Sequence, residues 1–258
     1  MKKPFPVLML ILGLAIYFVP AQAPAGTLLV EQTDPHNTFP SLPNSGDGYG
    51  LSDWTGMTLA LNNAFGAGNI TVSKASLDNL GYLLSFDRLW ITPPKPGGSL
   101  SSLEIANLRA FIATGRGVIM VGENNNWSAW NASILQSVGG TYTGLETSDT
   151  PLTPVLTHPL TAGVPLLTTD GDGLAVGGTP LFNENVATLW GDQQNVLSLL
   201  SISVIDDYFP GVRNEAFKVN MAEWLVAVPE PSSLAIVWLG GAAIAFWKAR
   251  KFIRRGQS

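Results

Sequence analysis

Short apolar runs alternate with stretches of helical spacing along the middle of the chain. Apolar-rich runs at 26–31, 86–92 and 117–121 predict strands, and the continuous apolar run at 117–121 is typical of a parallel sheet. A helix is predicted between the second and third runs, with Ser99, Ser101 or Ser102 as its cap and Glu104 in its first turn. Its apolar positions repeat every three or four residues, at Leu103, Ile105, Leu108, Phe111 and Ile112.

The same pattern continues on both sides of this unit. It predicts further helices at 54–65, 127–138 and 217–226, and further strands at 69–72, 186–190 and 196–204. Residues 141–185 are rich in Gly, Thr and Pro and predict a long, mostly β excursion. Strands and helices in this alternation predict right-handed βαβ units. The expected fold is α/β, a single doubly wound, mostly parallel sheet over residues 26–226.

The N-terminal 25 residues have the pattern of a secretory signal peptide. Lys2 and Lys3 precede an apolar run at 7–19, which is followed by small residues at A-x-A spacing. Cleavage after Ala23 or after Ala25 fits this spacing, and we favour Ala25 because Pro24 is a poor first mature residue. An uncleaved anchor is the alternative, but the run is shorter than the roughly 20 residues that span a bilayer.

The C-terminal segment, residues 227–258, predicts a membrane-directed tail. Pro229, Glu230 and Pro231 precede a predicted transmembrane helix at 232–249, and the two prolines favour an extended backbone around Glu230. A basic cluster places the end of the tail in the cytoplasm and the body outside it. This cluster consists of Lys248, Arg250, Lys251, Arg254 and Arg255.

Charge and composition separate the body from these two ends. The whole chain of 258 residues has a net charge of −5, but residues 26–228 contain seven basic and eighteen acidic residues, a net charge of −11. So acidic a body argues against a nucleic-acid partner. The chain has no cysteine, which excludes disulfides, thiolate metal sites and a cysteine nucleophile.

Residues 228–255 resemble the PEP-CTERM sorting signal of Gram-negative bacteria. The likeness rests on Val-Pro-Glu-Pro, a short hydrophobic helix and an Arg-rich end, in that order. Together with the signal peptide, which signal peptidase would cleave, it implies export, transient membrane anchoring by the tail, and processing of the tail by exosortase that releases the body to the outer surface. Proteins of this kind are associated with exopolysaccharide and biofilm. An ordinary anchor behind a Pro-rich linker is the alternative.

The body resembles the class I glutamine-amidotransferase-like superfamily, which is flavodoxin-like. The likeness rests on segments 86–92, 100–126, 157–164 and 220–225. In active members the turn after the strand equivalent to 117–121 carries a nucleophilic Cys in a Gly-x-Cys-x-Gly elbow. Here that turn reads Gly-Glu-Asn-Asn-Asn, so glutaminase chemistry is excluded and no catalytic residue or cofactor is predicted. The resemblance implies a structural or vestigial part for His158.

Polar residues after the predicted strands offer one speculative ligand or metal site. Asp34 and His36 follow the first strand and Glu123 follows a later one, and ligands bind at such strand ends. Two carboxylates and an imidazole suit a divalent cation. We favour the simpler interpretation, in which Asp34 and Glu123 form hydrogen bonds that cap their loops, so no metal is assigned.

Other polar clusters are weaker candidates. Asn124, Asn125 and Asn126 suit sugar hydroxyls, with Trp127 and Trp130 as possible stacking faces, although core packing is the commoner role of such Trp residues. The remaining candidates are half of a calcium loop at Asp170 and Asp172, for which we favour a plain turn, a weak nucleophile at Ser128, and an acidic pair expected to be solvated at Asp206 and Asp207.

Three functions stay open at this stage. The favoured hypothesis is an exported, exosortase-processed surface protein with a non-enzymatic structural or binding role in the extracellular matrix. The second is a metal-dependent envelope hydrolase that uses Asp34, His36 and Glu123. The third is a polysaccharide-binding module.

Overall fold

A computed structural model describes residues 26–32, 48–73, 77–93, 96–146, 151–207 and 214–228. No helix within these ranges has the length and apolarity needed to cross a bilayer. The predicted signal peptide at 1–25 and the predicted transmembrane helix at 232–249 lie outside them, as do Asp34 and His36.

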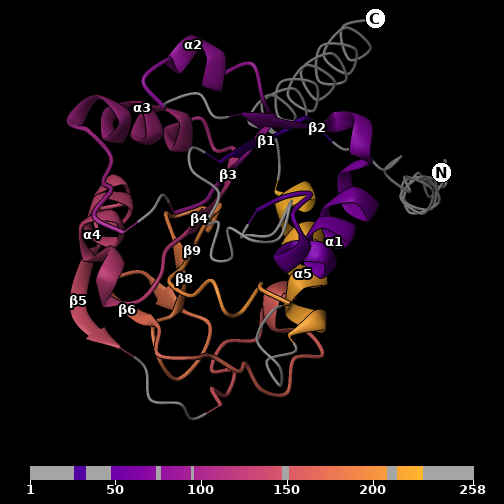
Figure 1. Cartoon of the computed structure of the whole chain (residues 1–258), viewed down its shortest axis with the longest axis vertical. Helices are drawn as coiled ribbons and strands as arrows, with labels where there is room; N and C mark the ends of the chain where they lie inside the picture. Colours follow the sequence, from indigo (N-terminus) through magenta and orange to yellow (C-terminus); the bar gives the residue numbers. More distant parts are fainter. Residues whose placement is uncertain are drawn as a thin grey trace, which may run out of the picture.

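A seven-stranded sheet forms the centre of the molecule, which confirms the predicted α/β class (Figure 1). Its order is β2-β1-β3-β4-β9-β8-β7, in which the first five strands run parallel and the last two are antiparallel. The strands are β1 (Leu28–Glu31), β2 (Ile70–Ser73), β3 (Arg88–Ile91), β4 (Gly117–Val121), β7 (Thr179–Pro180), β8 (Ala187–Trp190) and β9 (Val196–Leu199).

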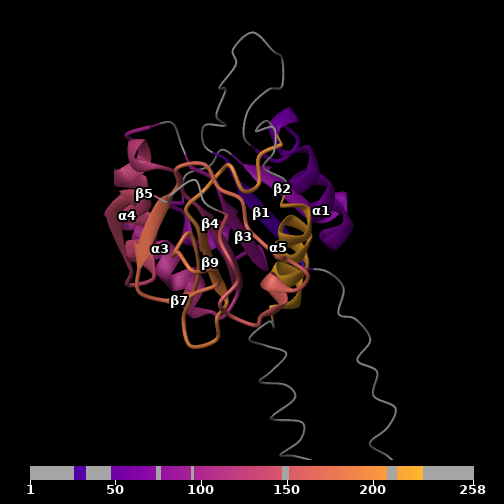
Figure 2. The same ribbon diagram turned by 90° about the horizontal axis from the view of Figure 1, so that it is seen from below.

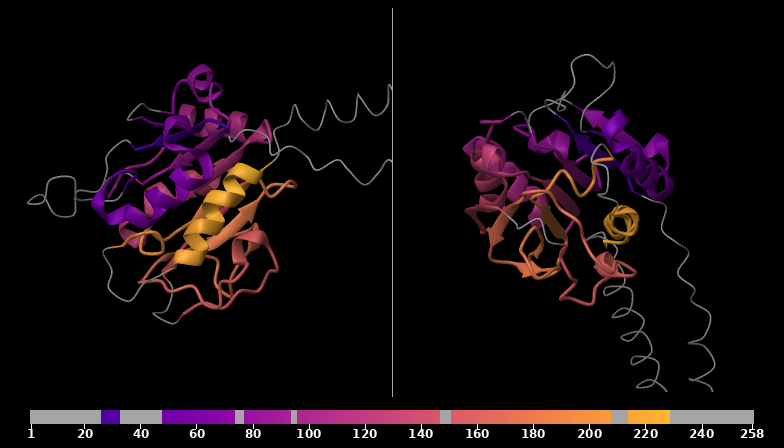
Figure 3. Two further views of the ribbon diagram at one scale, coloured as in Figure 1. Left: turned by 90° about the vertical axis from the view of Figure 1, so that its right-hand side faces the viewer. Right: turned by 60° about the horizontal axis from the view of Figure 1, so that its bottom comes forward.

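Helices cover both faces of this sheet (Figure 2). One face carries α1 (Thr55–Phe65) and α5 (Glu215–Ala227), which lie side by side (Figure 3). The other face carries α2 (Leu80–Leu83), α3 (Ser102–Ala113) and α4 (Ser128–Ser137). Single-turn 3₁₀ helices occur at Ser52–Trp54, Ala67–Asn69, Asn125–Trp127 and Pro159–Thr161.

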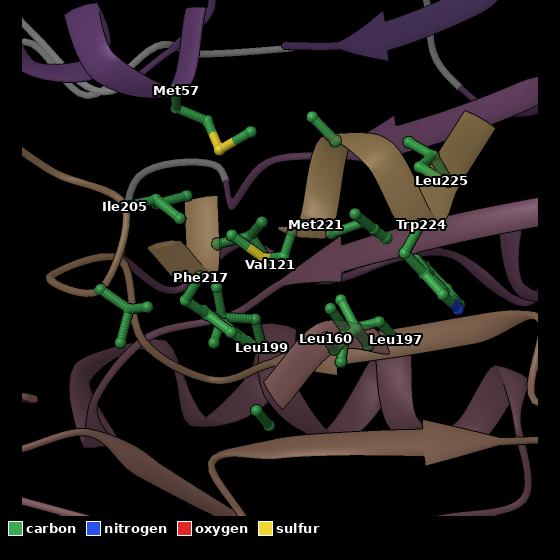
Figure 4. Packing of buried hydrophobic residues seen from close by; sticks show 14 of the residues in the cluster. Met57, Val121, Leu160, Leu197, Leu199, Ile205, Phe217, Met221, Trp224 and Leu225 are labelled. Atoms are coloured by element: carbon green, nitrogen blue, oxygen red, sulfur yellow. The ribbon is translucent and has the colours of Figure 1, made fainter. Parts of the chain in front are cut away.

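Alternate residues of each strand supply two separate cores, because successive side chains of a strand point to opposite faces. In β4, Ile119 and Val121 join the core beneath α1 and α5, whereas Val118 and Met120 join the core beneath α3 and α4. In Figure 4, Phe217 and Met221 of α5 lie close to this sheet. The burial of Phe217, Met221, Trp224 and Leu225 confirms the face predicted for the last helix.

The excursion at 141–185 is only partly β. It contains β5 (Thr141–Glu146) and β6 (Gly173–Val176), which form a separate antiparallel pair beside α4, and the short edge strand β7. Residues 151–172 are irregular, apart from the turn at Pro159–Thr161 and isolated bridges such as Leu152 to Leu167.

Two local predictions were wrong, and one helical turn was missed. The strand expected at 196–204 ends at Leu199, because the backbone of 200–206 turns to bind polar groups of other elements. Leu103 is 55% exposed instead of facing the core, since it lies in the first turn of α3 outside the buried stripe. The turn of helix α2 was not predicted, and its cap is the side chain of Asn79, which accepts from the Tyr82 amide.

Ser101 is the N-terminal cap of α3. Ser101 Oγ accepts the amide hydrogen of Glu104, and the Glu104 carboxylate accepts that of Ser101, which is a capping box. Of the three serines that the sequence offered, Ser101 therefore begins the helix.

Gly140 tests the packing between the β5–β6 pair and the main sheet. A Cβ atom at this position would lie 2.3 Å from the Trp190 ring, whose Nε1 is held by Ser198 Oγ at 2.8 Å. We expect Gly140→Ala to lower the free energy of unfolding by about 1–3 kcal/mol through overpacking. Gly68→Ala is the control, because nothing lies within 4 Å of its added Cβ. Equal urea midpoints for the two variants would contradict this packing.

Candidate functional site

Three buried carboxyl groups gather where β4 and β9 end, and we call Glu123, Asp172 and Asp206 the strand-end cluster. Glu123 is the second residue after β4, Asp172 lies in the turn before β6, and Asp206 lies near the end of the turn at 200–207 that follows β9. The Gly122 amide donates to the Leu199 carbonyl, and the Gly173 amide donates to the Leu200 carbonyl. These two bonds bring the three segments together.

The carboxyl group of Glu123 forms hydrogen bonds with other groups of the protein. Its Oε2 accepts from the Ile202 amide at 2.9 Å, and its Oε1 accepts from Asn124 Nδ2 at 3.2 Å. Its backbone is held from α4, because Asn131 accepts from the Glu123 amide and donates to the Glu123 carbonyl. These contacts agree with the hydrogen-bonded loop cap that we favoured for Glu123.

Two glycines allow these segments to approach so closely. A Cβ on Gly122 would lie 2.4 Å from Asn131 Oδ1, and one on Gly173 would lie 2.8 Å from the Glu123 carbonyl oxygen. Both distances are far below ordinary contact, so the packing around Glu123 requires glycine at both positions.

Serines of the turn after β9 hold the second acid. Ser203 Oγ lies 3.3 and 3.4 Å from the two carboxylate oxygens of Asp172, and Ser201 Oγ is 2.9 Å from Ser203 Oγ. The Asp170 amide also donates to Asp172 Oδ2 at 3.1 Å. Asp172 is fully buried whereas Asp170 is exposed, so the two do not face a shared ligand and the plain turn is the better description.

Burial raises the pKa of two of these acids. It raises the pKa of Glu123 to about 8, with the nearby Asp172 carboxylate as the second cause. Burial likewise raises the pKa of Asp172 to about 6, although hydrogen bonds from Ser201, Asp170 and Ser203 oppose the shift. At neutral pH Glu123 is therefore mostly neutral.

Asp206 and Asp207 are not the solvated pair that was predicted. Asp206 is buried, and Asp207 forms an ion pair with Lys218 of α5, which is only 1% exposed. Asp207 Oδ2 also accepts the Gly56 amide of α1 at 2.6 Å, and Glu215 Oε1 lies 3.6 Å from Lys218 Nζ. This ion pair joins α1, α5 and the turn after β9.

The asparagine-rich turn after Glu123 is partly exposed. Asn124 Oδ1 accepts from the Asn126 amide at 3.0 Å and begins the 3₁₀ turn, and Asn125 Oδ1 accepts from the Tyr142 hydroxyl. Asn125 and Asn126 are exposed and Trp127 is half-buried. Trp130 cannot serve as a stacking face, because it is buried and its Nε1 donates to the Val121 carbonyl at 2.8 Å.

His158 has a structural role. Its Nδ1 accepts from the Leu160 amide at 3.2 Å, and its own amide donates to Thr161 Oγ1, so it caps the 3₁₀ turn at Pro159–Thr161. Partial burial lowers its pKa.

Within the described ranges, no three His, Asp or Glu side chains are arranged to hold a metal ion. Asp34 and His36 of the predicted ligand set lie outside those ranges, and Glu123 is the member that the structure places. Sequence reasoning missed Asn131 and Asp172 as buried neighbours of Glu123, and it missed Lys218 as the partner of Asp207. A lysine on the apolar stripe of the last helix was the available signal.

The fold resembles those of several solved structures. The mmIFT52 N-terminal domain matches with a TM-score of 0.57 at 10% identity, over 78% of this chain and 97% of that one. The two share a fold. STM3548, a cytoplasmic protein from Salmonella typhimurium, matches with a TM-score of 0.48 at 12% identity over 77% of this chain and 98% of that one.

A ThuA-like protein from Bacteroides uniformis matches with a TM-score of 0.46 at 12% identity, over 82% of this chain and 96% of that one. No protein-family model matches the chain, and neither does any curated protein. At these identities the likeness concerns the fold alone.

The raised pKa of Glu123 predicts how stability depends on pH. The folded state keeps a proton between pH 4.5 and about 8 that the unfolded chain releases, so this contribution is full below pH 4.5 and is lost as pH rises through about 8. Glu123→Gln is neutral at every pH, so we expect its urea midpoint to vary much less than the parent's between pH 6 and 8.

Asp192→Asn is the matched control, since it removes one exposed acid. Its midpoint should follow the parent's. The raised pKa of Asp172 makes stability depend on pH below about 6 in all three proteins, so the midpoints are compared between pH 6 and 8. Parallel profiles for Glu123→Gln and the parent would contradict a protonated Glu123.

Proposed function

We propose that this chain is an exported cell-envelope protein whose tail is processed by an exosortase-type enzyme and whose body acts by binding, without catalysis. The observation that carries the proposal is the order of Pro229, Glu230 and Pro231, an apolar stretch and a basic end. Signal peptidase acts at the other end. The membrane holds the tail until processing releases the body to the surface matrix.

The described fold is compatible with this division of the chain. The first strand begins at Leu28, three residues after the proposed cleavage at Ala25, and the last helix ends at Ala227, two residues before Pro229. Both proposed processing sites therefore lie outside the folded elements. We further propose that the body is a single flavodoxin-like domain over 26–226. The strand order β2-β1-β3-β4-β9 supports this, because flavodoxin-like sheets have the order 2-1-3-4-5.

The strand-end turn supports a non-catalytic body. In the amidotransferase-like resemblance, the residue in this turn is the nucleophile. Here Glu123 occupies the turn, its carboxyl group accepts a hydrogen bond from the Ile202 amide, and only 6% of the residue is exposed. A side chain enclosed in this way has little access to a substrate. We propose on this basis that the turn holds the fold together.

Tail processing tests the sorting proposal. We expect Glu230→Gln and Pro231→Ala to leave the body folded and to stop removal of the tail, because the enzyme would lose the acid and the extended backbone that it recognises. Mass spectrometry of envelope fractions gives the mass of the mature protein. Glu223→Gln is the control, since it removes an exposed acid within α5. Normal tail removal in Glu230→Gln would refute the sorting proposal.

One exposed surface favours a saccharide as the matrix partner. The Asn125 and Asn126 side chains are exposed beside half-buried Trp127, and the Tyr142 hydroxyl meets Asn125. Amides and aromatic faces together suit neutral sugars. The net charge of −11 on residues 26–228 argues against a polyanionic polysaccharide as the partner.

Glycan arrays test this surface with neutral and acidic polysaccharides. We expect binding of a neutral glycan that falls at least tenfold in Trp127→Ala. Leu59→Ala, an exposed apolar residue of α1 on the opposite face, is the control and should bind as the parent does. Unchanged binding by folded Trp127→Ala would exclude this surface.

A further inference from the structure

Arg88, the first residue of β3, binds the C-terminal end of α5. Its Nε donates to the Leu225 carbonyl at 2.7 Å, and its Nη2 donates to the Val226 carbonyl at 3.3 Å and to the Val228 carbonyl. Its Nη1 donates to the Asp87 carbonyl at 2.8 Å. The residue is only 3% exposed, so one buried guanidinium holds three carbonyl groups at the point where the helix ends.

The end of a helix needs such a partner. The last carbonyl groups of a helix have no amide within it to bind, and they form the negative end of the helix dipole. The last turn of α5 contains no basic residue, so Arg88 supplies the positive charge from a neighbouring strand. The planar guanidinium presents several donors in one fork, which a lysine cannot imitate.

The chain is packed as well as hydrogen-bonded there. A Cβ on Gly117 of β4 would lie 3.0 Å from Arg88 Cδ, 3.0 Å from Leu225 and 3.3 Å from Val228. Val228 is itself buried. The body therefore holds its own chain firmly as far as Val228, and the next residue in the sequence is Pro229.

This has a consequence for the tail, which rests on the proposed function. An enzyme that acts at Glu230 in a cleft binds extended backbone on both sides of it. On the upstream side only Pro229 separates Glu230 from the clamped residues 225–228. Extending those residues means breaking the bonds to Arg88 and unwinding the last turn of α5.

We propose that Arg88 is a positioning residue that restrains tail processing by holding residues 225–228 against the body. Removal of the tail is then slow while the body is intact, because the enzyme must wait for the last turn to open. The body and its sorting signal are thereby coupled with no linker between them.

A spacer variant distinguishes a restraint of tail removal by Arg88 from an effect of Arg88 on the stability of the fold. We would insert six Gly and Ser residues between Val228 and Pro229 of the full chain, which leaves every Arg88 contact in place. Pulse-chase labelling in the producing bacterium would follow tail removal, and the urea midpoint of the mature protein would report stability. We expect the spacer to speed tail removal at least threefold with an unchanged midpoint.

Arg88→Lys completes the design. It keeps the charge but loses the fork, so we expect faster tail removal from the natural chain. In the spacer background the same substitution should leave the rate unchanged, since processing there no longer requires α5 to open. That difference between backgrounds is not expected of a residue that acts through stability alone.

The outcomes also separate this inference from the function beneath it. Tail removal that needs Glu230 but is equal or slower with the spacer overturns the role of Arg88 and leaves the sorting proposal standing. Tail removal that continues in Glu230→Gln overturns both. If Arg88→Lys fails to fold, the spacer variant alone decides the question.

Discussion

A sheet covered by helices on both faces shields its buried polar groups from water, so leaving a buried charge or acid without a partner in the protein is costly. Much of this structure follows from that constraint. The turn after β9 supplies the Ile202 amide to Glu123 and two serine hydroxyls near Asp172. Asp207 of the same turn forms an ion pair with Lys218, and Arg88 donates hydrogen bonds to carbonyl groups of α5. The seven residues 201–207 thus provide partners for polar side chains from three separate parts of the fold: Glu123, Asp172 and Lys218.

The regular elements of the sheet could be predicted because their signal is local. The apolar run of β4 and the helical repeat of α3 depend only on neighbouring residues, and both lie where the pattern placed them. The end of β9 could not be predicted in this way. Its apolar run continues to Val204, but the chain turns at Leu200. This turn brings the Ile202 amide to Glu123, 79 residues earlier, and Ser203 to Asp172, 31 residues earlier. Such long-range contacts leave no periodicity in the sequence.

The candidate site shows the same division. Glu123 was found because it follows an apolar strand, and its hydrogen-bonded role was the simpler of two expectations. Asp206 and Asp207 were expected in water, because an acidic pair after a strand is usually exposed. The missing information was Lys218, whose position among Phe217, Met221 and Ala222 put a charge on a buried face. A buried lysine requires an acid, and that argument would have led from α5 to Asp207.

The two edges of the sheet differ in what they allow a neighbouring molecule to do. At one edge, β7 is two residues long and ends in Pro180, which has no amide hydrogen to offer an added strand. At the other, β2 runs from Ile70 to Ser73 without a proline. Association through sheet edges is therefore one-sided. A second copy that paired through β2 would present only its own β7 edges outward, so growth would stop at two molecules and could not continue into a fibre. That asymmetry limits aggregation through sheet edges.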